Sequence, residues 1–122
     1  MNRSQPPVAL LLEDEPLIAM DVESTLQDGG FDVVTFATCS EAEAWLEHNH
    51  PAIAVVDITL RDGPCTEAVQ ELVRRNIPFI VHSGDMDRSA LPDLAFDAGT
   101  WMSKPSSSDA LMTTARNLAG LG

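Results

Sequence analysis

The sequence reads ALLLEDEP from Ala9 to Pro16. Four apolar residues are followed directly by three carboxylates, Glu13, Asp14 and Glu15. A continuous apolar run, rather than an alternating one, is typical of a strand that is buried on both faces of a parallel sheet. The three acids should then lie where this strand ends, and their mutual repulsion requires a neutralising partner.

Similar apolar blocks recur along the chain and alternate with segments of helical spacing. This alternation predicts an α/β fold in which helices cover both faces of a doubly wound, mostly parallel sheet. The chain is long enough for one domain, with a polar arm at 1–7, a folded domain at 8–119 and a tail at 120–122. The predicted strands are 8–12, 32–36, 52–56, 79–82 and 100–103.

The predicted helices are 16–27, 40–48, a third from Pro64 or Cys65 to Asn76, a fourth within 88–98, and 107–118. In the first, the apolar stripe is predicted to contain Leu17, Ile18, Met20, Val22 and Leu26. In the second, Ser40 followed by Glu43 has the pattern of a capping box. The fourth helix is the weakest prediction, because Pro92 would interrupt it and few apolar residues support it.

The composition excludes several classes of function. A formal net charge of −12 repels nucleic acids and anionic membranes, and no apolar run has the length of a membrane span. The start of the chain does not have the pattern of a signal peptide, so we expect a cytoplasmic protein. Cys39 and Cys65 are therefore expected to be separate core or surface residues rather than a disulfide.

Polar side chains follow four of the five predicted strands. Glu13 and Asp14 follow the first, Asp57 the third, Ser83 the fourth and Lys104 the fifth. In open α/β sheets the carboxyl ends of the strands form the site. Clustered carboxylates suit Mg²⁺, and a central carboxylate such as Asp57 can attack phosphorus. Lys104 and Ser83 would then bind phosphoryl oxygens.

The motifs LLLEDEP, AVVDITL, VHSGD and MSKPS, in this order, resemble the receiver domain of two-component response regulators. The resemblance covers nearly the whole chain and implies a flavodoxin-like (CheY-like) five-stranded parallel sheet with strand order 2-1-3-4-5. It also implies that Asp57 accepts a phosphoryl group from a sensor histidine kinase or a histidine phosphotransfer protein. By the same resemblance, Mg²⁺, which Mn²⁺ can replace, is held by Glu13, Asp14, Asp57 and the backbone carbonyl of Thr59.

The resemblance further implies a switch and a cis peptide. Ser83 would move toward the phosphoryl group and Trp101 would turn into the space it leaves, although tyrosine or phenylalanine is commoner at that position. The Lys104–Pro105 peptide is expected to be cis. Arg61 stands where the family commonly has proline, and His82, inside an apolar run, is expected to face a helix rather than the phosphate.

Two alternatives of other classes stay open. The first is an aspartate-dependent phosphatase, which would need a second acid at the position of Thr59. The second is a receiver-like binding module that is never phosphorylated. The leading expectation is a stand-alone receiver, a monomer or weak homodimer, that catalyses only its own phosphorylation and dephosphorylation. Its output would be altered binding to a partner protein. The face formed by the fourth helix, fifth strand and fifth helix, which is the family's usual signalling face, would also form the homodimer.

Overall fold

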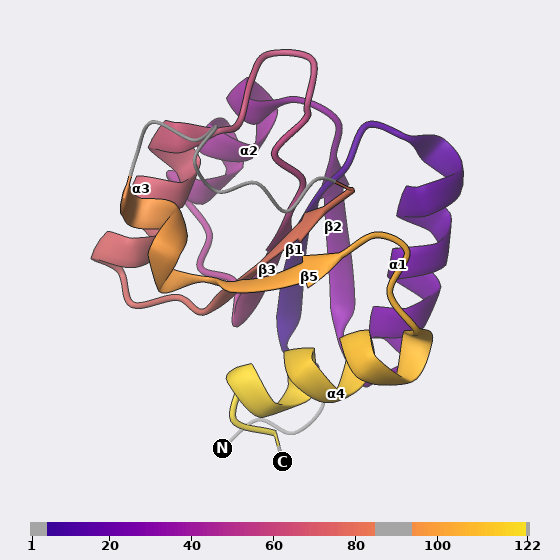
Figure 1. Cartoon of the computed structure of the whole chain (residues 1–122). Coiled ribbons are helices and arrows are strands. Elements are labelled where there is room, and N and C mark those ends of the chain that lie inside the picture. The colour runs from indigo at the N-terminus through magenta and orange to yellow at the C-terminus, as the bar shows by residue number, and fades with distance from the viewer. Residues whose placement is uncertain (1–4, 85–93, 122) are drawn as a thin grey trace.

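The computed structural model describes residues 5–84 and 94–121, which form one sheet covered by helices (Figure 1). The sheet has five parallel strands in the order β2-β1-β3-β4-β5, which confirms the order implied by the resemblance. The strands are β1 (Val8–Leu12), β2 (Asp32–Phe36), β3 (Ile53–Val56), β4 (Phe79–Ser83) and β5 (Thr100–Ser103). All five predicted strands are present, with bounds that differ by no more than one residue at each end.

The central strands are buried on both faces, as their continuous apolar runs predict. β1 is paired on both sides, so that Leu12 lies opposite Phe36 of β2 and Val56 of β3. All four residues of β3 and all five of β4 are buried, whereas the edge strands β2 and β5 are partly exposed. The crossovers thus bring the carboxyl ends of β1, β3 and β4 to one rim of the sheet.

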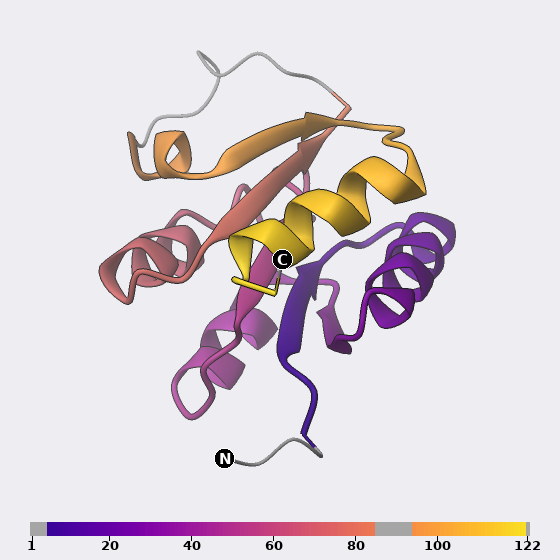
Figure 2. The same cartoon turned by 90° about the horizontal axis from the view of Figure 1, so that it is seen from below.

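Helices cover the two faces of the sheet, as Figure 2 shows from below. α1 (Pro16–Asp28) and α4 (Ser108–Leu118) pack together on one face. α2 (Cys39–Leu46) and α3 (Thr66–Arg74) cover the other, where the short 3-10 helix η2 (Leu94–Ala98) packs against α3. No helix within residues 5–84 and 94–121 is long and apolar enough to cross a membrane.

The predicted stripe of α1 is wrong in part. Leu17 and Met20 are 79% and 63% exposed, whereas Val22 and Leu26 are buried as expected. The residues that face the sheet are spaced three and four apart and include Ala19 and Thr25, a small and a polar residue that hydropathy alone passes over. The helix ends where predicted, at Gly29 and Gly30, and Gly30 has a φ of +97° that favours glycine.

The predicted cap of the second helix is also wrong. The N-cap of α2 is Thr38, whose side-chain oxygen accepts a hydrogen bond from the backbone N–H of Glu41. Thr38 and Glu41 have the same capping-box spacing as Ser40 and Glu43, so the motif occurs twice in overlapping register. Tertiary contacts with the β3–α3 loop select the earlier start.

The predicted fourth helix falls largely on residues 85–93, which lie outside the described residues, as do Asp85, Asp87 and Pro92. The remainder of that segment forms η2, from Leu94 to Ala98. The face predicted for output is therefore described only in β5 and α4, the latter being the helix predicted at 107–118. Ser107 caps α4 by accepting a hydrogen bond from the backbone N–H of Ala110.

The two cysteines are bonded to each other, contrary to the sequence-based expectation. Cys39 and Cys65 form a disulfide, with Cα atoms 5.1 Å apart. Cys39 is the first residue of α2 and Cys65 is the N-cap of α3. Both helices begin on the same face of the sheet, so residues 26 positions apart in sequence become neighbours. Their spacing along the chain contains no sign of this proximity.

Candidate functional site: an acidic cluster with a bridging lysine

Glu13 and Asp57 leave adjacent strands side by side. The hydrogen-bond pattern of the sheet continues one residue past each strand, where the N–H of Glu13 donates to Phe36 and the N–H of Asp57 donates to Leu12. Both residues are almost fully buried, with 3% and 2% of their surface exposed. The sheet therefore holds two carboxylates side by side in a buried position, where water screens their mutual repulsion poorly.

Asp14 completes a group of three carboxylates. One carboxylate oxygen each from Glu13, Asp14 and Asp57 can be chosen so that all three lie within 4.8 Å of one another. Asp14 is half-buried, so the group opens to solvent on its side. Three hard oxygen donors at this separation suit a small divalent cation such as Mg²⁺, which binds through carboxylates and retains water ligands.

Glu15, the third acid of the ALLLEDEP stretch, has a different part. It is the exposed N-cap of α1, one position before the first helical residue, Pro16. Its backbone N–H donates a hydrogen bond of 3.1 Å to Oε2 of Glu13. Glu15 thus supports the cluster through its main chain and not through its carboxylate.

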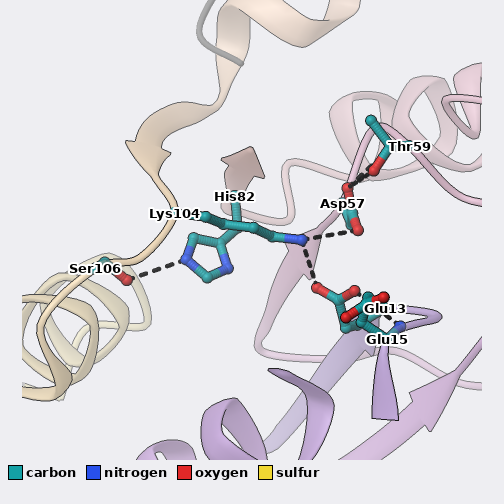
Figure 3. A network of polar contacts seen from close by, with 7 residues as sticks. All are labelled: Glu13, Glu15, Asp57, Thr59, His82, Lys104 and Ser106. Atoms are coloured by element: carbon teal, nitrogen blue, oxygen red, sulfur yellow. Dashed lines mark hydrogen bonds and ion pairs between the residues drawn. The ribbon is translucent and has the colours of Figure 1, made fainter. Parts of the chain in front are cut away.

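Lys104 bridges the two buried carboxylates, as Figure 3 shows. Its Nζ atom lies 2.7 Å from Oε1 of Glu13 and 2.9 Å from Oδ2 of Asp57. The backbone N–H of Lys104 donates to the carbonyl of Ser83 over 2.8 Å, and the Lys104–Pro105 peptide is cis as expected. One ammonium against three carboxylates leaves an excess of two negative charges, which a divalent cation would balance.

The environment separates the pKa values of the two carboxylates. Burial raises the pKa of Glu13, which the hydrogen bonds from Lys104 and Glu15 only partly offset and to which the charge of Asp57 adds. Burial also opposes ionisation of Asp57, but the hydrogen bonds from Lys104 and Thr59 outweigh it and lower its pKa. The pKa of Lys104 is raised, because its two carboxylate partners outweigh its burial. Asp57 is therefore the more acidic member of the pair.

Thr59 holds the other oxygen of Asp57. Its backbone N–H and its hydroxyl both donate to Oδ1 of Asp57, over 2.9 and 2.8 Å. The sequence assigned Thr59 a role only through its carbonyl, so these two hydrogen bonds are additional. With Oδ2 bound to Lys104 and Oδ1 to Thr59, the carboxylate is fixed in one orientation.

The remaining predicted residues lie on the same rim or beside it. Ser83 is fully buried at the end of β4, the strand between β3 and β5. Trp101 on β5 is half-buried against the core on the α2 and α3 side, and its indole N–H donates to the carbonyl of Phe96. Arg61 is exposed in the β3–α3 loop.

His82 points to the α1 and α4 side of the sheet, as the sequence predicts. It lines a cavity of about 360 Å³ together with Asp21 and Val22 of α1 and Leu111 of α4. Its Nε2 lies 3.0 Å from the hydroxyl of Ser106, two residues after Lys104 (Figure 3). Burial, followed by the nearby charge of Lys104, lowers the pKa of His82. Folding therefore favours the neutral form of this imidazole.

Asp62 has a role that the sequence did not reveal. Its carboxylate accepts hydrogen bonds from the backbone N–H groups of Cys39 and Ser40, over 2.8 and 3.2 Å. These are free N–H groups at the first turn of α2. An acid in a loop is a weak signal in the sequence, because only the fold brings Asp62 to the start of α2.

Comparison with known proteins agrees with this geometry. The model of the response regulator receiver domain family matches residues 9–116. The chain therefore belongs to the receiver domain family of two-component response regulators.

Two curated relatives show the extent of the similarity. The phyllosphere-induced regulator PhyR of Methylorubrum extorquens is 40% identical over 75 residues, which are 58% of this chain and 28% of that protein. Response regulator Rre1 of Synechocystis is 27% identical over 121 residues, 94% of this chain and 52% of that protein. The chain thus spans about half of one relative and less than a third of the other.

A solved structure shares the fold. The receiver domain of a sensor histidine kinase from Pseudomonas aeruginosa, determined with a magnesium ion coordinated in its active site cleft, has a TM-score of 0.81 and 21% identity. The alignment covers 94% of this chain and 98% of that one.

Proposed function

We propose that this receiver domain accepts a phosphoryl group on Asp57 from a phosphohistidine, in a reaction that depends on Mg²⁺. The donor would be a sensor histidine kinase or a histidine phosphotransfer protein. The observation that carries the proposal is the state of Asp57, which is buried and ionised, with one oxygen held by Thr59 and the other by Lys104. A fixed, desolvated carboxylate is a suitable nucleophile toward phosphorus.

In the proposed step a carboxylate oxygen of Asp57 forms a bond to phosphorus, and the bond from phosphorus to the donor's imidazole nitrogen breaks. The imidazole leaves with the electron pair of that bond and takes up a proton. Lys104, released from part of its contact with Asp57, would balance the charge of the transferred group. The Ser83 hydroxyl would donate to another phosphoryl oxygen.

Glu13, Asp14, Asp57 and the carbonyl of Thr59 would hold Mg²⁺. The ion supplies positive charge to phosphoryl oxygens during transfer. The excess negative charge of the cluster supports this assignment, and the magnesium-bound receiver domain from Pseudomonas aeruginosa supports it by analogy. Mn²⁺, which also prefers oxygen ligands, would substitute.

The proposed output is a change in binding to another protein, without a substrate beyond the domain's own phosphoryl group. Ser83 and Trp101 would transmit phosphorylation to the surface of β5, because Trp101 packs against the core and its indole N–H donates to the carbonyl of Phe96 in η2. We expect the protein to act in the cytoplasm together with this donor. Nucleic acid is an unsuitable direct partner for a chain with a net charge of −12.

The test is transfer from a small phosphodonor. Acetyl phosphate with Mg²⁺ should add one phosphoryl group, seen by intact mass, in the wild-type protein and not in Asp57→Ala. The Asp109→Ala variant, which removes an exposed carboxylate from α4, serves as the matched control and should be modified normally. Absence of modification from both acetyl phosphate and a phosphorylated kinase would reject the proposal, and turnover of phosphomonoesters would favour a phosphatase instead.

A further inference from the structure

The Cys39–Cys65 disulfide encloses the proposed phosphoacceptor within a covalent ring. The ring runs from Cys39 through α2 and β3 to Cys65, and Asp57 is one of the residues in it. Only the β3–α3 loop separates Asp57 from Cys65. A constraint at Cys65 therefore acts on the segment that also carries Thr59, whose N–H and hydroxyl orient Asp57.

Two kinds of bond attach this loop to the start of α2. One is the disulfide, and the other is the pair of hydrogen bonds that the Asp62 carboxylate accepts from Cys39 and Ser40. Asp62 is exposed, so water competes for its hydrogen bonds. The disulfide does not depend on solvent, and its loss would leave the loop held to α2 by noncovalent contacts, among them the hydrogen bonds of Asp62 and the contact of the Cys39 sulfur with the carbonyl of Gly63.

The position of the two sulfurs favours reversible chemistry. Cys39 begins α2 and Cys65 caps α3, so each sulfur lies at a helix N-terminus, where a thiolate is stabilised. Both cysteines are buried, with 5% and 3% of their surface exposed, and they line a hollow of about 370 Å³ between the starts of the two helices. Asp62, Glu43 and Glu67 line the same hollow and would repel an anionic reductant such as glutathione. An uncharged dithiol would meet less electrostatic repulsion at this surface than glutathione.

We propose that Cys39 and Cys65 form a redox-modification site whose disulfide keeps the β3–α3 loop, and with it Asp57, in the arrangement that accepts a phosphoryl group. A thiolate of a dithiol attacks one sulfur and the Cys39–Cys65 bond breaks, which gives a mixed disulfide. The second thiol of the reductant then closes its own disulfide. Two electrons and two protons pass to the cysteine pair, and the oxidised form of the same couple reverses the reaction.

The cytoplasmic location included in the proposed function would favour a regulatory role over a structural one. Disulfides in a reducing cytoplasm are uncommon, and those that occur there are usually transient, catalytic or redox-sensing. The inference rests on the proposed function, because its consequence is read at Asp57. The redox chemistry of the pair is nevertheless measurable without phosphorylation.

The experiment compares the protein after treatment with oxidised and with reduced dithiothreitol, under native conditions. Alkylation followed by intact mass should count no free thiols in the first sample and two in the second, since the chain has two cysteines. Amide hydrogen exchange over residues 58–64 should become about tenfold faster on reduction. The rate of phosphorylation by acetyl phosphate should fall by at least about threefold, as a loosened acceptor loop predicts.

The control is the Cys39→Ser/Cys65→Ser double variant, which should exchange and react at the rates of the reduced wild type in both buffers. The wild-type comparison stands by itself if that variant does not fold. Resistance of the native disulfide to dithiothreitol, equal exchange over 58–64 in both states, or faster phosphorylation of the reduced protein would overturn the inference. If the protein is phosphorylated in neither state, the proposed function is rejected. Alkylation and hydrogen exchange still show whether reduction of the Cys39–Cys65 disulfide loosens the β3–α3 loop.

Discussion

The Nζ atom of Lys104 lies 2.9 Å from Oδ2 of Asp57 and, at the same time, 2.7 Å from Oε1 of Glu13. The lysine lies within the acidic cluster and neutralises part of it, while Asp14 remains outside this bridge. The charge of Lys104 thus stabilises the folded protein before any phosphoryl group arrives. Five predictions concern this site, its buried histidine and the disulfide.

Replacing Lys104 should destabilise the protein and make its stability depend on Mg²⁺. In Lys104→Met, Glu13 and Asp57 face each other without a cation, and the loss of one partner from a buried ion pair costs about 3 kcal/mol. Urea unfolding at neutral pH should show this loss, and millimolar Mg²⁺ should recover part of it. Arg74→Met removes an ion pair from the exposed surface of α3 and should change little. Equal stability of Lys104→Met and wild type would contradict the assignment.

Removal of the Glu13 charge should raise the stability of the protein and weaken its binding of Mg²⁺. The pKa of Glu13 is raised by folding, so the folded state favours its protonated form, and stability is lost as pH rises through the folded pKa. Glu13→Gln mimics the protonated form. Its free energy of unfolding at neutral pH without Mg²⁺ should therefore exceed that of wild type, while calorimetry should show weaker Mg²⁺ binding. A variant that is less stable and binds Mg²⁺ normally would contradict both parts.

Adjacent acids of the ALLLEDEP stretch should differ in their effect on Mg²⁺. Asp14→Ala removes a carboxylate of the cluster, so we expect weaker Mg²⁺ binding and slower phosphorylation together. Glu15→Ala keeps the backbone N–H that donates to Glu13, so we expect neither change. Titration calorimetry of the two variants against wild type measures the difference. Equal Mg²⁺ affinities in Asp14→Ala and Glu15→Ala would show that the cluster is not the metal site.

His82 should contribute to acid sensitivity. Its pKa is lowered in the folded protein, so the unfolded chain takes up the proton first, and stability is lost as pH falls below the ordinary histidine pKa. Between about pH 7 and pH 5, His82→Gln should show a shallower fall in the free energy of unfolding than wild type. His48→Gln, which changes an exposed histidine after α2, is the control and should keep the wild-type slope.

The disulfide should contribute stability through the unfolded state. Closing a loop of 26 residues between Cys39 and Cys65 restricts the unfolded chain by about 3 kcal/mol in the loop-entropy model. Reduced wild type and the oxidised protein should therefore differ by about this amount in urea unfolding. The Cys39→Ser/Cys65→Ser variant should match the reduced protein and lose its sensitivity to reductant. An unchanged midpoint after verified reduction would contradict this prediction.

The sequence by itself determined the order of elements and the membership of the acidic cluster. Buried parallel strands need continuous apolar runs, and their ends converge on one rim, so Glu13, Asp14, Asp57 and Lys104 could be predicted to meet from their places after strands. The direction of His82 was predictable from its place inside an apolar run, whereas the cis Lys104–Pro105 peptide was implied by the resemblance to receiver domains.

Only the tertiary structure decided which groups touch across elements that are distant in the chain. The disulfide, the bond from Asp62 to the start of α2, and the choice of Thr38 over Ser40 as its cap all depend on the packing of the β3–α3 loop against α2. The bridge from Lys104 to Glu13 likewise depends on how the last loop crosses the rim. Hydropathy and spacing indicate which side of a helix or strand is buried. Contacts between distant elements depend on distances that exist only after the chain has folded.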